Sequence, residues 1–434
     1  MVERDDTYKA FDLALRIGEI LLSSGAGAAD VTATMLAVTR ACGVQRVTAD
    51  VTYTNISLHH QPSAEAPTAL QVRRVIPRGV DYDTLTKVDQ VVRDLMSEQV
   101  TRDEARDVVA RVVSTGHTRR RWAVTLGWGV MGGGVALTLS GNPVVLALAF
   151  FAACAIDRTQ LLMRHRRIPA FYQQIAGAAV ATLIAVTASA LELEANPSRV
   201  VTAGIVMLLA GIGVMGATQD AITGFPVTAS ARLLDALLAT TGIIAGVGAG
   251  LSVGLMLGVD VGPIEPASVG LPRAALMLSG AALAASGFAF ASYAPLRALL
   301  PVAVVGGLGQ LVSIAVGKTE LGSTFASALA AIAMGAVCFT AAGRFHVPPL
   351  VIVVPAIVPL LPGLEVYRGL ALLADGADGV PDLVSAAATA IALAAGVILG
   401  QYLSQPLQRE AHWLEARLSG PRLVGPRTGR KRGV

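Results

Sequence analysis

The sequence predicts an α-helical polytopic membrane protein of about ten spans that carries a small α+β soluble domain at its N-terminus. The 434 residues are 53% hydrophobic and only 15% charged, whereas about a quarter of the residues of a soluble domain are charged. The charges are also segregated: residues 1–121 hold 16 basic and 16 acidic side chains, and residues 122–405 hold only 11 and 12. Residues 406–434 hold 7 and 2, which predicts a basic tail.

Composition also excludes several classes of partner and cofactor. The pI near 9.1 follows from membrane topology and not from nucleic-acid binding, because no basic face with interleaved aromatic residues is present. Cys42, Cys154 and Cys338 are too far apart for a zinc site or a redox motif. We therefore expect no metal, no cofactor and no nucleic acid. The first residues lack a signal-peptide pattern, so the soluble domain is expected in the cytoplasm.

Residues 1–118 show the patterns of a mixed domain. Apolar residues recur at helical spacing in some segments and alternate with polar residues in others. Thr101 and Glu104 form a capping-box pattern, which predicts the start of the last helix of the domain. Helices are expected over 10–21, 28–41, 83–97 and 101–114, and strands over 47–53, 57–60 and 69–76.

The domain also contains residue types that are used in catalysis. These are Asp50, Ser23, Ser24, His59 and His60. No nucleophile elbow, zinc-binding motif or phosphate-binding motif surrounds them, and neighbouring histidines on a strand point to opposite faces. A regulatory or assembly role is favoured, and we expect that the protein is not an enzyme. A membrane-anchored hydrolase that uses this domain is the alternative from another class.

The rest of the chain predicts ten membrane spans in two halves, 119–260 and 261–405. A span needs about 20 apolar residues, and Arg119–Arg121 with Trp122 mark the entry into the bilayer. The expected spans are 123–139, 143–156, 170–190, 200–217, 236–258, 272–291, 296–316, 322–342, 347–364 and 384–403.

Loop charges predict the orientation of these spans. One set of connections is rich in arginine and the other is acidic, so the positive-inside rule puts both termini in the cytoplasm of a multi-pass protein of the plasma (inner) membrane. Because five is an odd number, two similar halves of five spans would be inverted relative to each other. Leu208-Leu209-Ala210-Gly211 in the fourth span resembles Leu360-Leu361-Pro362-Gly363 in the ninth, which is consistent with this plan.

The ninth span is interrupted by prolines. Pro355, Pro359 and Pro362 lie in an otherwise apolar stretch, and three prolines would cost about 9 kcal/mol in a regular helix. We therefore expect a kinked or broken helix. Irregular backbone at membrane depth has to be buried in protein or line a cavity, and in transporters such places bind substrate. The stretch, which includes Gly363, is interpreted as a substrate pathway. A kinked packing helix is the alternative.

Two groups of charged residues lie beside the spans and complete the candidate site. Asp220 follows the fourth span, Arg232 and Asp235 are three residues apart at the start of the fifth, and Glu365 and Arg368 repeat this spacing after the ninth. Residues three apart share a helical face, so each spacing predicts an ion pair. A carboxylate binds the ammonium of an amino acid and an arginine binds its carboxylate. The alternative is that these pairs anchor helix ends.

Five stretches together resemble the threonine/serine exporter family over most of the chain, from Leu13 to about Leu403. They are A-L-R-I-G-E-I-L-L-S-S-G-A-G-A-A-D-V (14–31), D-V-T-Y-T-N-I-S-L (50–58), R-V-I-P-R-G-V-D-Y-D-T-L (74–85), D-A-I-T-G-F-P-V-T-A-S-A-R (220–232) and V-P-A-I-V-P-L-L-P-G-L-E-V-Y-R-G-L (354–370). The resemblance implies a cytoplasmic N-terminal domain, ten spans and export of threonine and serine driven by the proton gradient. The chain departs from the family pattern at Ala210-Gly211, where Pro-Gly is expected.

These observations predict a proton-coupled exporter of small hydroxy amino acids. Its partners would be threonine or serine, protons and the lipid bilayer, and a homo-oligomer is left open. Asp220, Asp235 or Glu365 would carry the proton. Relatives with the two halves on separate subunits are linked to dicarboxylate export, so a dicarboxylate exporter that uses Arg232, Arg344 and Arg368 is the alternative within the class.

Overall fold

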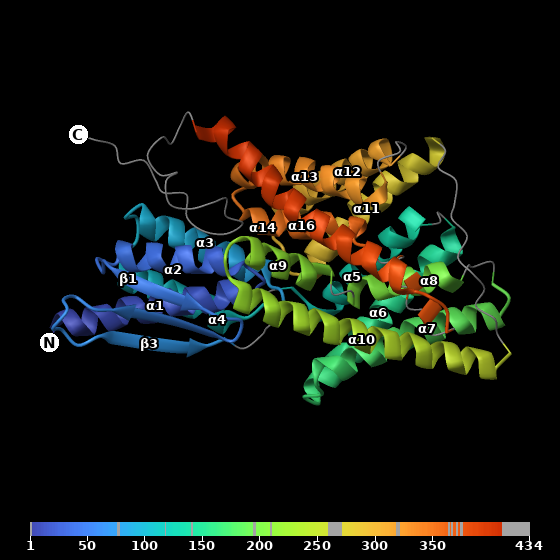
Figure 1. Ribbon diagram of the computed structural model, residues 1–434, viewed down its shortest axis with the longest axis horizontal. Coiled ribbons are helices and arrows are strands. Elements are labelled where there is room, and N and C mark those ends of the chain that lie inside the picture. The colour runs from blue at the N-terminus through green and yellow to red at the C-terminus, as the bar shows by residue number, and fades with distance from the viewer. Residues whose placement is uncertain are drawn as a thin grey trace.

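The computed structural model describes residues 2–409 with short gaps. These gaps are 76–78, 118, 140–141, 194–196, 209–210, 259–270, 318–321, 363–364, 366–367, 370–371 and 374–375. Gly363 and residues 410–434, which make up most of the predicted basic tail, therefore lie outside the described residues. The N-terminal domain and the bundle of apolar helices lie end to end along the long axis of the molecule (Figure 1).

The N-terminal domain is an antiparallel three-stranded sheet packed with four helices. Its strands lie in the order β1-β2-β3, and α1 packs against β2 and β3 while α2 packs against α1 and β1. Ile56 and Leu58 of β2 are fully buried with Phe11 and Ile17 of α1. The capping box of Thr101 and Glu104 is present. The bounds are α1 Val2–Ser23, α2 Ala28–Ala41, β1 Val47–Val51, β2 Asn55–His60, β3 Ala69–Arg74, α3 Tyr82–Met96 and α4 Arg102–Thr115.

Eight of the remaining helices that the structure describes are long and apolar enough to cross a membrane. They are α5 Arg121–Leu139, α6 Pro143–His165, α7 Ala170–Ala190, α10 Pro226–Met256, α11 Leu271–Ala291, α12 Leu296–Val316, α13 Ser323–Phe345 and α16 Val380–Arg409. The number of spans rises to nine if the bent pair of helices Pro197–Leu208 and Ile212–Ile222 is counted as one span. Ten spans therefore stay a prediction.

The fourth predicted span is not the continuous helix that was expected over 200–217. It consists of α8 Pro197–Ile205 with the 3₁₀ turn η1 Val206–Leu208, followed by α9 Gly211–Ile222. The two parts are bent by 46°. The ninth predicted span is also interrupted, because the short helix α14 Pro349–Ile357 is followed only by the 3₁₀ turn η2 Val358–Leu360. Both interruptions are expected to leave backbone groups without helical partners.

The two halves of the bundle share helix lengths and packing partners. In each half a helix of nine residues that begins with proline is followed by a 3₁₀ turn of three. The packing of α5 with α6, α6 with α7, and α7 with α10 is repeated by α11 with α12, α12 with α13, and α13 with α16. Equivalent helices begin at a nearly constant separation along the chain: Pro143 and Leu296, Ala170 and Ser323, Pro197 and Pro349, and Pro226 and Val380.

The halves meet where α5 crosses α11 with direct backbone contact. A Cβ atom added at Gly134 would lie 2.5 Å from the Ala284 nitrogen and 2.8 Å from the Gly280 oxygen. A Cβ atom at Gly287 would lie 2.9 Å from the Gly127 oxygen. Small residues allow such close contact between helices in lipid, where no hydrophobic effect drives their association. These four glycines therefore allow the two halves to pack together.

We predict that Gly134→Ala destabilises the protein, because its methyl group has to push α5 away from the α11 backbone. Overpacking of this kind costs about 1–3 kcal/mol, so the melting temperature in detergent should fall. Gly133→Ala is the matched control, because its nearest new contact would be at 3.6 Å. Equal melting temperatures for the two variants would contradict the assignment of the α5–α11 contact to Gly134.

Candidate functional site

The proline-rich stretch breaks as the sequence predicts. Pro349 occupies the first turn of α14, where a missing N–H has no consequence. Pro355 lies inside the helix, where proline removes a hydrogen bond. The chain then tightens into η2, which contains Pro359, and becomes extended at Leu361. Pro362 follows directly, so regular helix ends inside the apolar segment.

Protein surrounds this broken helix. Every residue from Leu350 to Val358 is buried, and α14 packs against α11, α12 and α13. At 1.5 Å per residue, α14 and η2 together rise about 18 Å, which is little more than half of a hydrocarbon core of about 30 Å. The helix is therefore too short to cross a bilayer alone and is enclosed by protein, which is the condition under which lipid tolerates irregular backbone.

A second buried break lies at the equivalent place in the first half. Residues of α8 from Val200 to Ile205 are buried, and α8 with η1 packs against α5 just as α14 with η2 packs against α11. This break was not predicted from the sequence. The signals that could have found it are Pro197 and the resemblance of Leu208–Gly211 to Leu360–Gly363. The two breaks thus lie against the two helices that join the halves.

Asp220 and Arg232 form a buried ion pair that binds the N-terminal domain. Arg232 Nε lies 3.1 Å from Asp220 Oδ2, and Arg232 and Asp220 are 8% and 0% exposed. The Ala28 N–H donates to Asp220 Oδ1 at 2.8 Å, and Arg232 Nη2 donates to the Ala26 carbonyl at 2.7 Å. The predicted pairing of Arg232 with Asp235 is therefore wrong. The partner of Arg232 is Asp220 on α9, which the i,i+3 spacing within one helix could not identify.

Asp235 also contacts the N-terminal domain. It is exposed on α10, and its Oδ2 atom accepts a hydrogen bond of 3.1 Å from the Tyr53 hydroxyl. Burial is the largest cause that raises the pKa of Tyr53, and the Asp235 charge is the second. Tyr53 is therefore protonated at neutral pH and donates this hydrogen bond. Nearby, Thr228 donates to the Val51 carbonyl at 3.2 Å. The corner between α9 and α10 is thus held by the α1–α2 turn and by the β1–β2 turn.

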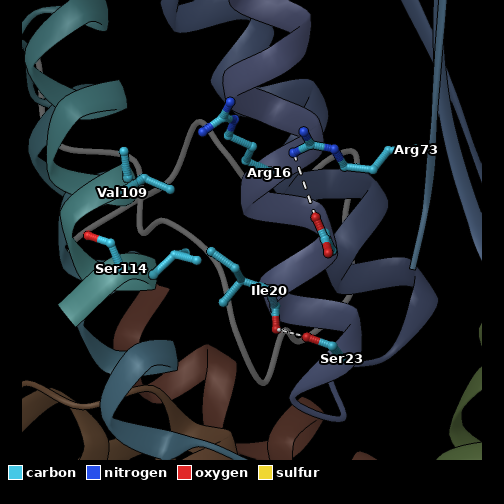
Figure 2. Close-up of a pocket in the computed structure, with 9 residues that line it drawn as sticks. Arg16, Ile20, Ser23, Arg73, Val109 and Ser114 are labelled. Carbon is cyan, nitrogen blue, oxygen red and sulfur yellow. Dashed lines mark hydrogen bonds and ion pairs between the residues drawn. The ribbon is translucent and has the colours of Figure 1, made fainter. Parts of the chain in front are cut away.

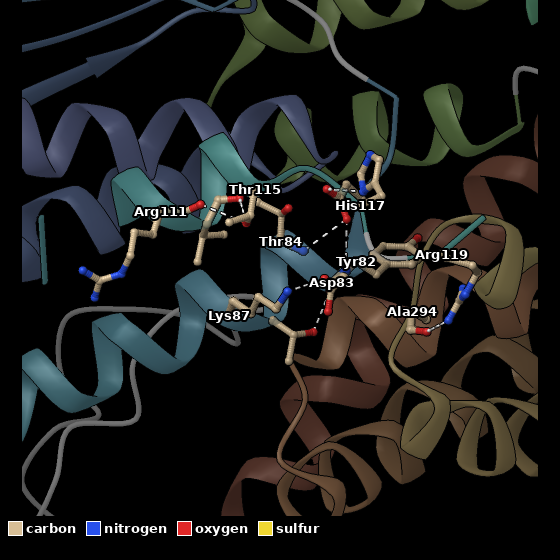
Figure 3. Close-up of polar contacts among 12 residues, drawn as sticks. Tyr82, Asp83, Thr84, Lys87, Arg111, Thr115, His117, Arg119 and Ala294 are labelled. Carbon is tan, nitrogen blue, oxygen red and sulfur yellow. Dashed lines mark hydrogen bonds and ion pairs between the residues drawn. The ribbon is translucent and has the colours of Figure 1, made fainter. Parts of the chain in front are cut away.

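The N-terminal domain makes a second contact, with the α11–α12 turn (Figure 3). The Tyr82 N–H donates to the Ser292 carbonyl at 3.0 Å, and Arg119 donates to the Phe290 and Ala294 carbonyls. The His117 ring stacks on Tyr293 with 3.7 Å between ring centres. A cavity of about 390 Å³ lies beside these groups. One domain thus holds a corner from each half of the bundle.

Glu365 and Arg368 lie beyond the broken ninth helix. Glu365 is partly buried, and its Oε2 atom accepts a hydrogen bond of 3.3 Å from the Ser385 hydroxyl of α16. Arg368 is partly buried on the same segment. Glu365 therefore contacts a membrane helix, whereas Asp220 and Asp235 contact the N-terminal domain.

Asp157 is a buried carboxylate that was not predicted from the sequence to belong to the site. It is 5% exposed on α6, accepts a hydrogen bond of 2.7 Å from Thr125 and pairs with Arg121. The predicted span ended at residue 156, so Asp157 lay just outside it. Gln310 is buried in α12, and its separation from Asp157 along the chain equals the separation between the starts of α6 and α12.

The residues that suggested hydrolysis lie on different elements. Ser24 follows α1 and is buried, the Ser23 hydroxyl donates to the Ile20 carbonyl, and His59 and His60 lie on β2. Among the residues that the structure describes, no three His, Cys, Asp or Glu side chains form a group that could hold a metal ion.

Comparison with known proteins identifies similar sequences over both halves. The family model described as "Putative threonine/serine exporter" matches residues 12–254, and "Threonine/Serine exporter, ThrE" matches residues 277–403. A protein of Mycobacterium tuberculosis named "Probable threonine/serine exporter" is 36% identical over 411 residues, which cover 93% of this chain and 78% of the relative. The "Threonine/serine exporter" of Corynebacterium glutamicum is 35% identical over 421 residues, which cover 94% and 85%. No solved structure matches the chain.

We predict that Asp220→Asn strongly destabilises the full-length protein, because it leaves Arg232 buried without a countercharge. Breaking a buried pair in this way costs about 3–5 kcal/mol, and the loss should appear as a lower melting temperature and faster proteolysis of the N-terminal domain. The double variant Asp220→Asn with Arg232→Met should recover part of the loss. Asp235→Asn, at an exposed position, is the control, and an Asp220→Asn protein as stable as this control would rule out the pair as the docking contact.

Proposed function

The chain belongs to the threonine/serine exporter family, and from this premise we propose that it is a secondary active exporter of threonine and serine. It is a multi-pass membrane protein, with eight described helices that can cross a bilayer. The proposal is supported by two relatives of that name, each at least 35% identical over more than nine-tenths of this chain.

The observation that carries the proposal is the pair of buried helix breaks beside α5 and α11. The backbone N–H and C=O groups at the end of a broken helix can bind an ammonium and a carboxylate without additional charged side chains. The hydroxyl group that distinguishes threonine and serine needs one more polar partner, which the same backbone can supply. In this proposal the substrate binds between η1 and η2, with Pro355, Pro359 and Pro362 shaping one side of its site.

We propose further that the two halves are inverted repeats of five spans. Their support is the recurrence of helix starts at a nearly constant separation and the equivalent packing partners. An inverted pair can open to either side of the membrane by rocking one half against the other around a fixed site. The glycine crossing of α5 and α11 would be the pivot of that motion.

Contacts of the helix corners support ten spans. The α9–α10 corner binds the N-terminal domain, which precedes α5, so an even number of crossings separates them. That number is four if the bent pair α8–α9 crosses once. The α11–α12 turn binds the same domain after six crossings. After eight crossings, the His346 carbonyl accepts a hydrogen bond from Arg297 at the start of α12, so His346 lies on the same side as that turn. With both termini in the cytoplasm, as the basic loops predict, the segment from α14 to α16 supplies the last two crossings.

Glu365 is our proposed coupling carboxylate. Asp220 and Asp235, which were the other candidates, bind the N-terminal domain. Glu365 is held by a single described hydroxyl contact of 3.3 Å, which protonation can break at small cost. A proton that crosses 100 mV releases about 2.3 kcal/mol, enough for roughly a 50-fold solute gradient. Arg368 would add its positive charge to the backbone N–H groups that bind the substrate carboxylate when Glu365 is protonated.

Dicarboxylate export has less support from the contacts, because Arg232, one of its three expected ligands, is committed to Asp220 and to the Ala26 carbonyl. Transport also accounts for the broken helices, which a membrane-anchored hydrolase would not need.

We predict that Glu365→Gln abolishes threonine transport driven by a pH gradient and keeps exchange of labelled for unlabelled threonine. The amide cannot release a proton but can still bind Ser385. Both reactions are measured with full-length protein in proteoliposomes, and driven uptake should fall at least tenfold. Asp235→Asn is the control and should keep both. Undiminished driven uptake by Glu365→Gln would show that another group carries the proton.

The substrate class has a separate test. Excess serine should suppress exchange of labelled threonine, because both carry an ammonium, a carboxylate and a hydroxyl. Succinate, which lacks the ammonium, should leave the exchange unchanged within twofold. Competition by succinate and not by serine would indicate dicarboxylate export.

A further inference from the structure

The N-terminal domain contains a cavity of about 330 Å³ between α1, β3 and α4 (Figure 2). This volume is at the lower end of the range for small-molecule sites, roughly 300–1,000 Å³. The cavity is separate from the contacts with the bundle and from the broken helices. Its lining consists of Arg16, Glu19, Ile20 and Ser23 of α1, Arg73 of β3, and Val109, Ala110, Val113 and Ser114 of α4.

Its charged end carries an excess of guanidinium groups. Asp12 Oδ2 lies 3.0 Å from Arg16 Nε and 3.7 Å from Arg106 Nε, and Arg73 lies 3.4 Å from Asp12 and 3.6 Å from Glu19. Asp12 and Arg106 lie outside the lining, whereas Arg16, Arg73 and Glu19 belong to it, so the lining itself carries one net positive charge. Because a guanidinium has five N–H donors, these arginines can also bind the carboxylate of a ligand. Glu19 supplies a negative charge for an ammonium group.

The rest of the cavity suits the side chain of a small amino acid. Arg16 and Arg73 lie at one end, Ile20 and Val109 lie in the middle, and Ser23 and Ser114 lie towards the other end (Figure 2). Each serine hydroxyl donates to a carbonyl of its own helix, Ser23 to Ile20 and Ser114 to Arg111. Their oxygen lone pairs remain able to accept a hydrogen bond from a ligand hydroxyl.

The cavity is linked to the membrane bundle through the end of α1. Ser23 lines the cavity, and shortly after it the Ala26 carbonyl accepts a hydrogen bond from Arg232. The Ala28 N–H donates to Asp220. A ligand that reorients the last turn of α1 therefore acts on the buried ion pair that joins α9 and α10 to the domain.

We propose that this cavity binds a free amino acid and that its occupancy activates transport through the α1–α2 turn. The regulatory part of the proposal rests on the proposed function. An exporter that is activated by the internal amino acid would export little of it when its internal concentration is low. The binding part stands on the cavity alone.

The test uses full-length protein and Val113→Trp, which fills the cavity from a position that is 45% exposed and so should not disturb folding. Arg111→Trp, on the same helix but outside the lining, is the matched control. Calorimetric titration with threonine should show two sites in wild type and in the control, and one site in Val113→Trp. Arg16→Gln should weaken the same site at least tenfold.

Transport in proteoliposomes gives the second readout. The dependence of threonine flux on threonine concentration should be sigmoidal in wild type and in Arg111→Trp, and hyperbolic in Val113→Trp. Equal stoichiometry and equal curves for all variants would overturn the proposal. Displacement of the second threonine by succinate would overturn the assignment of an amino-acid ligand. If wild type showed no threonine flux, the proposed function would fail, while loss of one binding site in Val113→Trp would still support the cavity.

Discussion

The need to enclose unpaired backbone groups inside a membrane is the constraint on which the rest of this structure depends. Prolines interrupt the apolar α14 helix after only nine residues, and each N–H or C=O left without a partner there would cost several kcal/mol in lipid. The bundle meets this constraint by surrounding α14 with α11, α12 and α13. In the first half, α5, α6 and α7 surround α8 in the same way. Helix α5, which packs against α8 and η1, is in direct contact through glycines with α11, which packs against α14 and η2.

The N-terminal domain is joined to both halves of the bundle. It binds the α9–α10 corner through a buried ion pair and the α11–α12 turn through Tyr82, His117 and Arg119. Each corner comes from a different half of the bundle, so relative movement of the halves has to strain or release at least one of the two contacts. A ligand in the domain can for this reason influence movement in the bundle, although its cavity is separate from the broken helices.

Buried polar residues show how the two halves differ although their helices correspond. Asp157 of α6 and Gln310 of α12 occupy equivalent positions, yet the first is charged and pairs with Arg121 while the second is neutral. The ion pair of Asp220 and Arg232 belongs to the first half, which the N-terminal domain binds at that point. Glu365, in contrast, belongs to the second half. The N-terminal domain contacts both halves, but the described residues place its buried ion pair in the first half only and the proposed coupling carboxylate in the second.

The sequence by itself determined the features that depend on local composition. Apolar length located most of the membrane helices, alternation located the three strands, and Pro355, Pro359 and Pro362 located the break in the ninth predicted span, because each effect acts within a few residues of its cause. Only the tertiary structure decided the partners of the charged residues. Asp220 is 192 residues from Ala28, and Arg232 has acidic neighbours on both sides along the chain, so packing of α9 against α10 selected between them. The fourth predicted span is bent by 46° although the sequence has no proline between η1 and α9, so local composition could not reveal a bend in a segment whose α8 helix is packed among α5, α6 and α7.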